Sequence, residues 1–218
     1  MLDVIEITVA SELLVLHPYR AVYWPKNNSL MVTDLHLGKI QHFIKAGISL
    51  PSHASMDNFE RLSSTLLQFQ PERLLILGDL FHSDYNSDWR VFSELRQTFA
   101  AVQFDLILGN HDSLDSKLYA DNKIDVHENL KIGPFLLTHK PLEGSPDYNI
   151  AGHLHPGVKL YGQSRQSLTL PCFYFGSRQA ILPAFGTFTG VYKLKPEKED
   201  RIIVISSDHL IDVTPEEA

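Results

Sequence analysis

The sequence predicts an α/β protein in which two β-sheets pack face to face with helices outside them. Three observations support this fold class. Short apolar runs fill the opening third, strand and helix patterns alternate in the middle, and strand patterns dominate the second half. We expect a single domain over residues 1–218, because the length suits one α/β domain and no linker or repeat of about 20 to 50 residues divides the chain.

Four short strands are expected in the opening third, at residues 5–9, 13–16, 21–24 and 30–33. Each run is rich in residues that favour extended backbone, and polar turn residues such as those at positions 26–29 separate the runs.

Two helices are expected in the middle of the chain. From Ser55 onward, apolar residues recur every three or four positions until Pro71, which marks the end of the first helix. The same spacing returns over residues 89–99, where Ser87 or Asp88 is positioned to cap the second helix. Strands at 74–77 and 104–108 end at Gly78 and Gly109, so strand and helix alternate here.

The second half consists mostly of strand patterns. We expect strands at residues 135–138, 148–151, 158–161, 168–175, 186–194 and 201–206.

Composition limits the classes of function. Nineteen basic and 26 acidic residues give a net charge of −7, which opposes tight nonspecific binding of duplex DNA. An anionic substrate stays open, because a bound metal centre is itself strongly positive. Cys172 is the only cysteine, so no intrachain disulfide can form and a reducing cytoplasm fits best. The N-terminus lacks a signal-peptide pattern, and no apolar run approaches the roughly 20 residues of a membrane span.

Polar residues with metal-binding chemistry follow several of the predicted strands. The fragments contain Asp34 and His36; Asp79 and His82; Asn110, His111 and Asp112; His139; and His153 and His155. Ligands of α/β sheets collect beyond the carboxyl ends of strands, so these side chains are expected in one crevice. Glycines at 78, 109 and 152 would let the backbone turn sharply there.

Each fragment alone has a simpler interpretation. A Gly-Asp pair after a strand is usually a turn, and an isolated His-x-His is usually a surface pair. Six of the 11 histidines, however, lie in five fragments at strand ends, and chance does not explain that arrangement well.

Taken in order, the fragments resemble the calcineurin-like metallophosphoesterase family, whose pattern runs D-x-H, G-D, G-N-H-D, a lone His, and G-H-x-H. All five parts are present. The resemblance implies a four-layered α-β-β-α sandwich that binds two divalent metal ions. It assigns Asp34, His36 and His155 to one ion, Asn110, His139 and His153 to the other, and Asp79 to both. These nitrogen and oxygen ligands favour Mn, with Fe or Zn as alternatives.

Three further residues are candidates for catalysis. His111 matches the family histidine near the leaving group, and Asp112 is interpreted either as the residue that orients its ring or as a cap or turn residue. His82 lies in G-D-L-F-H, which resembles a nuclease branch of the superfamily in which this histidine contacts the scissile phosphate. The alternative for His82 is a residue that orients a metal ligand. The protein phosphatases carry G-D-x-V-D-R-G and G-N-H-E instead, so phosphoproteins are not the expected substrate.

A closer resemblance extends over nearly the whole chain. The segments 34–39 (DLHLGK), 47–51 (GISLP), 170–173 (LPCF) and 182–186 (LPAFG) are similar to those of the bacterial ligase-associated DNA damage response endonucleases. This implies a phosphodiesterase that acts on damaged or single-stranded DNA, with a DNA ligase, an exonuclease and a helicase as partners in the same repair system. Hydrolysis of small nucleotides or cyclic nucleotides is the alternative function. A non-catalytic scaffold is disfavoured, because no ligand of the pattern is missing.

Several basic side chains are candidates for contacts with a nucleic-acid backbone near the metals, although ordinary solvated surface charge is the better explanation for most of them. They are Lys39, His42, Lys45, Arg165 and Arg178.

Overall fold

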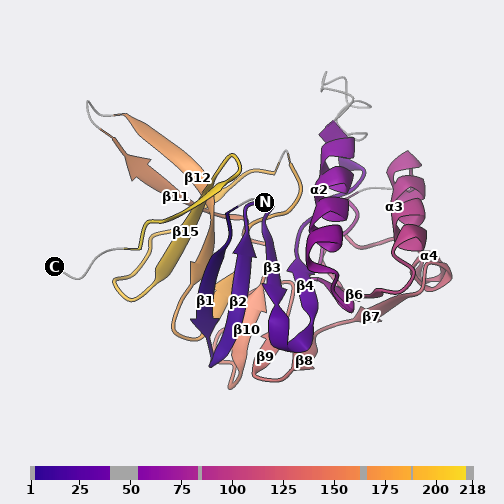
Figure 1. Ribbon diagram of the computed structural model, residues 1–218, viewed down its shortest axis with the longest axis horizontal. Coiled ribbons are helices and arrows are strands. Elements are labelled where there is room, and N and C mark those ends of the chain that lie inside the picture. The colour runs from indigo at the N-terminus through magenta and orange to yellow at the C-terminus, as the bar shows by residue number, and fades with distance from the viewer. Residues whose placement is uncertain (1–2, 40–53, 83–84, 163–165, 188, 215–218) are drawn as a thin grey trace.

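The computed structural model describes residues 3–39, 54–82, 85–162, 166–187 and 189–214, which form two packed β-sheets with helices along one of them (Figure 1). In the first sheet, the strand order follows the chain, antiparallel from β1 to β4 and parallel from β4 to β7. Its strands are β1 (Ile5–Val9), β2 (Glu12–His17), β3 (Ala21–Trp24), β4 (Ser29–Val32), β5 (Arg73–Ile76), β6 (Gln103–Ile107) and β7 (Ile124–His127).

The second sheet is also mixed and is built around the long strand β12. The first half of β12 pairs with β11, and its second half pairs with β13 and β15. The path of the sheet is β14-β11-β12-β13-β10-β9-β8, with β15 and β16 attached to β12. The strands are β8 (Leu130–Ile132), β9 (Phe135–Leu137), β10 (Tyr148–Ala151), β11 (Pro156–Tyr161), β12 (Ser167–Phe175), β13 (Gln179–Ile181), β14 (Tyr192–Lys193), β15 (Arg201–Ser206) and β16 (His209–Asp212).

The two mixed sheets confirm the predicted fold class. Helices α2 (Ala54–Phe69) and α3 (Ser87–Thr98) cover the outer face of the first sheet, the short α4 (Ser116–Asp121) precedes β7, and the 3-10 turn η1 (Pro25–Asn27) links β3 to β4 (Figure 1). Among the described residues, the helices all precede Asn122. The outer face of the second sheet instead carries a small apolar cluster around Cys172, Ile202 and Val204.

Alternation along the strands divides the core into two layers. Leu30 and Val32 of β4 face the helices, where they join Phe59 and Phe92, while Met31 between them faces the second sheet. Phe135 and Phe173 of the second sheet belong to the same core layer as Met31. Full burial of each such side chain stabilises the fold by roughly 1.5–3 kcal/mol. The buried side chains between the sheets therefore hold the two sheets together, and the loops at the sheet ends are free to form a site.

Two details of the sequence prediction are wrong. The cap of α3 is Asn86, whose side chain accepts a hydrogen bond from the backbone N of Asp88 at 2.9 Å. Asp88 is buried and instead accepts from the backbone N of Gly38 at 3.0 Å. Among the described residues of the predicted strand 186–194, only Tyr192–Lys193 pairs, as β14, because the backbone of Gly186 bonds instead to the loop that follows β4.

Candidate metal centre

The loops after five strands meet at one end of the two sheets. Parallel strands β4, β5 and β6 place Asp34, Asp79 and Asn110 just beyond their carboxyl ends, as the topology requires. From the second sheet, the parallel pair β9 and β10 adds His139 and His153, and His155 follows. The structure thus brings together all seven residues that the sequence pattern assigned to metals.

The first triad consists of Asp34, His36 and His155, whose ligand atoms all lie within 4.8 Å of one another. Nε2 of His155 is 3.2 Å from Oδ1 of Asp34 and 3.3 Å from Nε2 of His36.

The second triad consists of Asp79, His139 and His153. Nε2 of His139 is 3.0 Å from Nδ1 of His153 and 3.5 Å from Oδ1 of Asp79. Oδ1 of Asn110 lies 3.2 Å from the same His139 nitrogen. The other oxygen of Asp79, Oδ2, is 3.9 Å from Nε2 of His36 in the first triad. Asp79 therefore lies between the triads with one oxygen turned toward each.

Backbone carbonyls orient two of the imidazole rings. Nδ1 of His139 lies 3.0 Å from the carbonyl of Leu77, and Nδ1 of His155 lies 3.3 Å from that of Gly190. A carbonyl accepts only, so Nδ1 carries the proton and Nε2 presents a lone pair. The rings are thereby held in the tautomer that a metal ligand needs.

One buried oxygen of Asp34 lacks a hydrogen-bond donor in the part of the chain that the structure describes, which indicates that a cation fits this centre. Oδ2 accepts hydrogen bonds from the Thr33 hydroxyl at 2.6 Å and from the backbone N of His153 at 2.9 Å. Oδ1 is buried without a hydrogen-bond donor among the described residues and faces the two ring nitrogens of the first triad. A buried carboxylate oxygen rarely stays unsatisfied. Carboxylate, imidazole and amide donors without thiolate fit a borderline or hard divalent ion.

The titration of these groups agrees with metal binding. Burial lowers the pKa of His36 to about 3, although Asp34 opposes the shift, so the ring is neutral near pH 7. Burial and the nearby His139 also lower the pKa of His153. Burial would raise the pKa of Asp34, yet its pKa is lowered, in part by the hydrogen bond from the Thr33 hydroxyl, which keeps this carboxylate charged. Neutral imidazoles and an ionised carboxylate are the forms that bind metal ions.

The backbone of the ligand loops is strained. Asp34, His36, Asp79, His153 and His155 all have positive φ, between 48° and 67°. This left-handed region costs a non-glycine residue of order 1 kcal/mol or more, and such residues concentrate where function requires a fixed side-chain direction.

The three glycines of the motifs have different reasons for being there. Gly78 makes the expected turn with φ of 85°. Gly109 and Gly152 do not have positive φ, so the expectation of a sharp turn is wrong for them. They are small because a neighbour is close: a Cβ on Gly109 would lie 2.2 Å from Oδ1 of Asp79, and one on Gly152 would lie 1.8 Å from Oγ1 of Thr33.

Two further histidines stand beside the first triad. His111 is half-buried, with Nε2 4.0 Å from Oδ2 of Asp79 and its backbone N donating to Oδ1 of Asp79 at 2.9 Å. His82 packs against His111 with ring centroids 4.4 Å apart, and its Nδ1 lies 3.2 Å from Nδ1 of His36. That contact places His82 against His36 of the first triad, a geometry that agrees with the orienting alternative.

Asp112 has a different position from the one expected for a residue that orients the ring of His111. Oδ2 accepts from the backbone N of Gly109 at 2.9 Å and Oδ1 from that of Phe81 at 3.1 Å. The carboxylate therefore ties the loop after β6 to the loop after β5.

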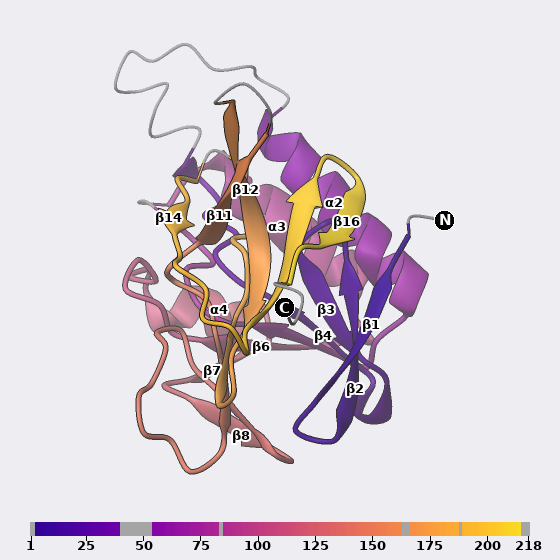
Figure 2. The same ribbon diagram turned by 90° about the vertical axis from the view of Figure 1, so that its left-hand side faces the viewer.

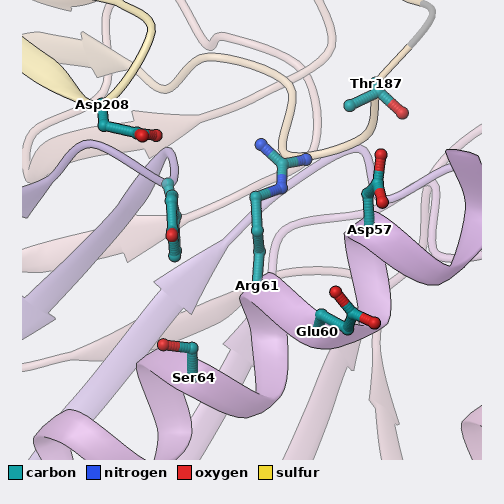
Figure 3. A pocket seen from close by; sticks show the side chains of 7 residues that line it. Asp57, Glu60, Arg61, Ser64, Thr187 and Asp208 are labelled. Carbon is teal, nitrogen blue, oxygen red and sulfur yellow. The ribbon is translucent and has the colours of Figure 1, made fainter.

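Backbone contacts from the segment around Phe185 hold the Asp34 loop, and the sequence patterns do not predict them. The backbone N of Phe185 donates to the carbonyl of Thr33, and that of Gly186 to the carbonyl of Asp34. Arg61 of α2 reaches across a surface pocket toward this chain segment and donates to the carbonyl of Phe185 at 2.8 Å (Figure 3). The sequence signal was the segment 182–186, which carries the closer resemblance but does not by itself show a contact with residues 33 and 34.

The basic candidates fall into three groups. Lys39 follows the Asp34 loop and is close enough for Asp34 and Asp79 to raise its pKa, although burial lowers it by more. Arg178 instead donates to the carbonyl of Ser145, at the amino end of β13 and so away from the metal centre. This placement corrects its expected role. His42, Lys45, Arg165 and the segment 47–51 lie outside the described residues.

Comparison with known proteins agrees with the geometry. Residues 29–206 match the family described as calcineurin-like phosphoesterase. The crystal structure of Pseudomonas putida nuclease MPE is similar over 97% of this chain and 100% of its own, with a TM-score of 0.83 and 28% sequence identity. A phosphoesterase from E. coli, Yfce, aligns over 85% of this chain and 98% of its own, with a TM-score of 0.42 and 14% identity. No curated protein sequence matches the chain.

Proposed function

The chain belongs to the calcineurin-like phosphoesterase family, and from this premise we propose that it is a dinuclear-metal phosphodiesterase that cleaves DNA. It is a metal-dependent phosphoesterase with two candidate metal sites. The observation that carries the proposal is the pair of His/Asp triads with Asp79 between them. The similarity to nuclease MPE, which extends over almost the entire chain, supports DNA as the substrate.

The ligands are assigned from their positions. Asp34, His36 and His155 would hold one ion, while Asn110, His139 and His153 would hold the other, with Asp79 shared. We propose Mn²⁺ as the metal, with Fe or Zn as alternatives. Two such ions, when bound, supply an activated nucleophile near neutral pH and polarise the phosphoryl oxygens.

His111 is the proposed general acid. Its ring is 40% exposed and stands beside Asp79 and His36, so it can reach a substrate without being a ligand itself. Donation of a proton from its imidazole to the departing oxygen would stabilise the charge that develops there. The backbone N of His111 donates to Asp79, and this hydrogen bond fixes the backbone position from which the imidazole projects.

The biological setting is also a proposal. The resemblance to ligase-associated endonucleases suggests DNA repair in the bacterial cytoplasm, beside a ligase, an exonuclease and a helicase. The single cysteine fits that compartment. Among the described residues, no helix is long and apolar enough to cross a membrane.

A substrate panel tests the proposed function. The Mn-reconstituted chain is assayed on single-stranded and duplex DNA, bis-p-nitrophenyl phosphate, p-nitrophenyl phosphate and a cyclic nucleotide, with metal content measured in parallel. We expect two metal ions per chain and preferred turnover of DNA and the synthetic diester. Equal or faster turnover of the cyclic nucleotide would favour the small-nucleotide function instead.

A further inference from the structure

The acidic residues of the chain are distributed unevenly. Residues 148–196 contain no aspartate or glutamate, although the chain has 26 of them, and they carry five lysines or arginines. This stretch runs from β10 to just past β14 and includes the proposed ligands His153 and His155. Two of these basic residues, Lys159 and Lys193, lie on β11 and β14, the strands next to His155. The overall charge of −7 therefore conceals a stretch beside the metal centre that has lysines and no carboxylates of its own, which favours an anionic partner there.

Part of this region projects from the packed sheets as the β11–β12 hairpin (Figures 1 and 2). β11 begins at Pro156, directly after His155. β14 is anchored at the same point, because the backbone N of Tyr192 donates to the carbonyl of His155 at 2.9 Å. At roughly 3.3 Å per residue, β11 leads about 20 Å away from the metal centre. Anything bound along it would be continuous with a substrate at the metals.

The two faces of the hairpin differ in chemistry. Val158, Leu160 and Leu170 pack on one face, against the small apolar cluster of the second sheet. Side chains alternate along a strand, so Lys159 and Tyr161 point to the other face. Lys193 is in register with Gly157 and therefore shares that second face. All three side chains are exposed, and Tyr161 is 78% exposed.

The aromatic and basic groups on this face are already close to each other. Nζ of Lys159 lies 5.1 Å from the centroid of the Tyr161 ring. Proteins that bind single strands without sequence preference combine cations along the backbone with aromatic rings on which bases stack. A duplex hides its base faces and needs a wider basic surface. The pattern on this face therefore matches a single strand.

We propose that the face formed by Lys193, Lys159 and Tyr161 binds single-stranded DNA that extends outward from the metal centre. The two lysines contact consecutive phosphates, and a base stacks on the Tyr161 ring. This inference rests on the proposed function, since it names the form of DNA that the same site receives.

Fluorescence anisotropy of the full-length, Mn-loaded chain with a labelled oligo-dT that carries hydrolysis-resistant phosphorothioate linkages tests the proposal. Tyr161→Ala should weaken binding about 5- to 100-fold, whereas Tyr161→Phe, which keeps the ring, should bind within about twofold of wild type. Lys159→Ala and Lys193→Ala should each reduce the slope of log affinity against log salt by about 0.7. Lys117→Ala is the matched control, because Lys117 is an exposed lysine on α4 and not on the hairpin. This substitution should change neither the affinity nor the salt dependence.

A second assay separates this proposal from the proposed function. Hydrolysis of bis-p-nitrophenyl phosphate by the Mn-loaded Tyr161→Ala variant should equal wild type, because that substrate is too small to reach the hairpin. Unchanged oligo-dT affinity in Tyr161→Ala, an equal loss on the small diester, or wild-type affinity for duplex DNA as high as for oligo-dT would each overturn the hairpin assignment. A wild-type protein that cleaves the small diester but no DNA would instead refute the proposed function.

Discussion

Nε2 of His36 and Nε2 of His155 face each other at 3.3 Å, although the residues are 119 positions apart. Nδ1 of His155 is turned to the Gly190 carbonyl and Nδ1 of His36 to His82, so both Nε2 atoms point at the space beside Oδ1 of Asp34. Three electron-rich atoms converging in a buried site repel one another unless a cation lies between them. A divalent cation bound between these three atoms would remove this repulsion and stabilise the folded chain.

Metal removal should lower stability for this reason. A cation whose free concentration is about 100 times its Kd adds roughly 2.7 kcal/mol to the free energy of unfolding. For a chain of this size, that corresponds to a fall in Tm of about 5–10 °C on chelation. Differential scanning calorimetry with Mn²⁺ and with EDTA measures the change. An identical Tm under both conditions would contradict cation binding in the native state.

Asp79→Asn should remove most activity, because the shared carboxylate faces both triads. The substitution keeps the shape of the side chain and removes its charge, so the affinity for both ions should fall and kcat on bis-p-nitrophenyl phosphate should drop by about 100-fold or more. Metal analysis of the purified variant accompanies the kinetics. Asp125→Asn, an exposed carboxylate on β7, is the matched control. Full activity in Asp79→Asn would refute the shared position.

His111→Ala should separate chemistry from metal binding. The backbone N–H that holds Asp79 survives the substitution, so metal content should stay near wild type while kcat on DNA falls about 10²- to 10⁴-fold. The loss should be smaller on bis-p-nitrophenyl phosphate, whose leaving group needs little protonation. Loss of metal from this variant would make His111 a ligand instead of an acid.

Much of the fold follows from local patterns in the sequence. Strands 5–9, 21–24, 148–151 and 201–206 have the bounds that their apolar runs predict, because alternation and turn residues act over a few positions. The strand ends also predict that the loops carrying the Asp, Asn and His residues converge, since parallel strands deliver their carboxyl ends to one edge.

Local sequence patterns do not predict contacts between segments that are distant in the chain. Residues 186–194 have strand propensity, yet the backbone of Gly186 bonds to Asp34, and Gly190 accepts from His155. Gly152 looks like a turn residue but is required by the closeness of Thr33. Such tertiary contacts override local propensity, and no window of sequence contains both partners.

His82→Ala distinguishes between the two interpretations of that residue. The 3.2 Å contact between the Nδ1 atoms of His82 and His36 favours an orienting role. Loss of such a partner typically weakens metal affinity about 10- to 100-fold, so monoester and diester rates should fall together at limiting Mn²⁺. Rate measurements against Mn²⁺ concentration on both substrates decide. A loss confined to diesters, with unchanged metal affinity, would instead support direct contact with the scissile phosphate.

Asp112→Asn should act through the loops and not through the ring of His111. Both carboxylate oxygens accept backbone N–H donors, and an amide group would turn its own NH₂ toward one of them. One buried hydrogen bond is lost and the stability should fall by about 1–3 kcal/mol in urea unfolding. Because the freed Gly109 loop carries Asn110, the second metal should bind more weakly while the leaving-group dependence of kcat stays as in wild type. If kcat instead falls more on DNA than on bis-p-nitrophenyl phosphate, with stability unchanged, then Asp112 orients the His111 ring after all.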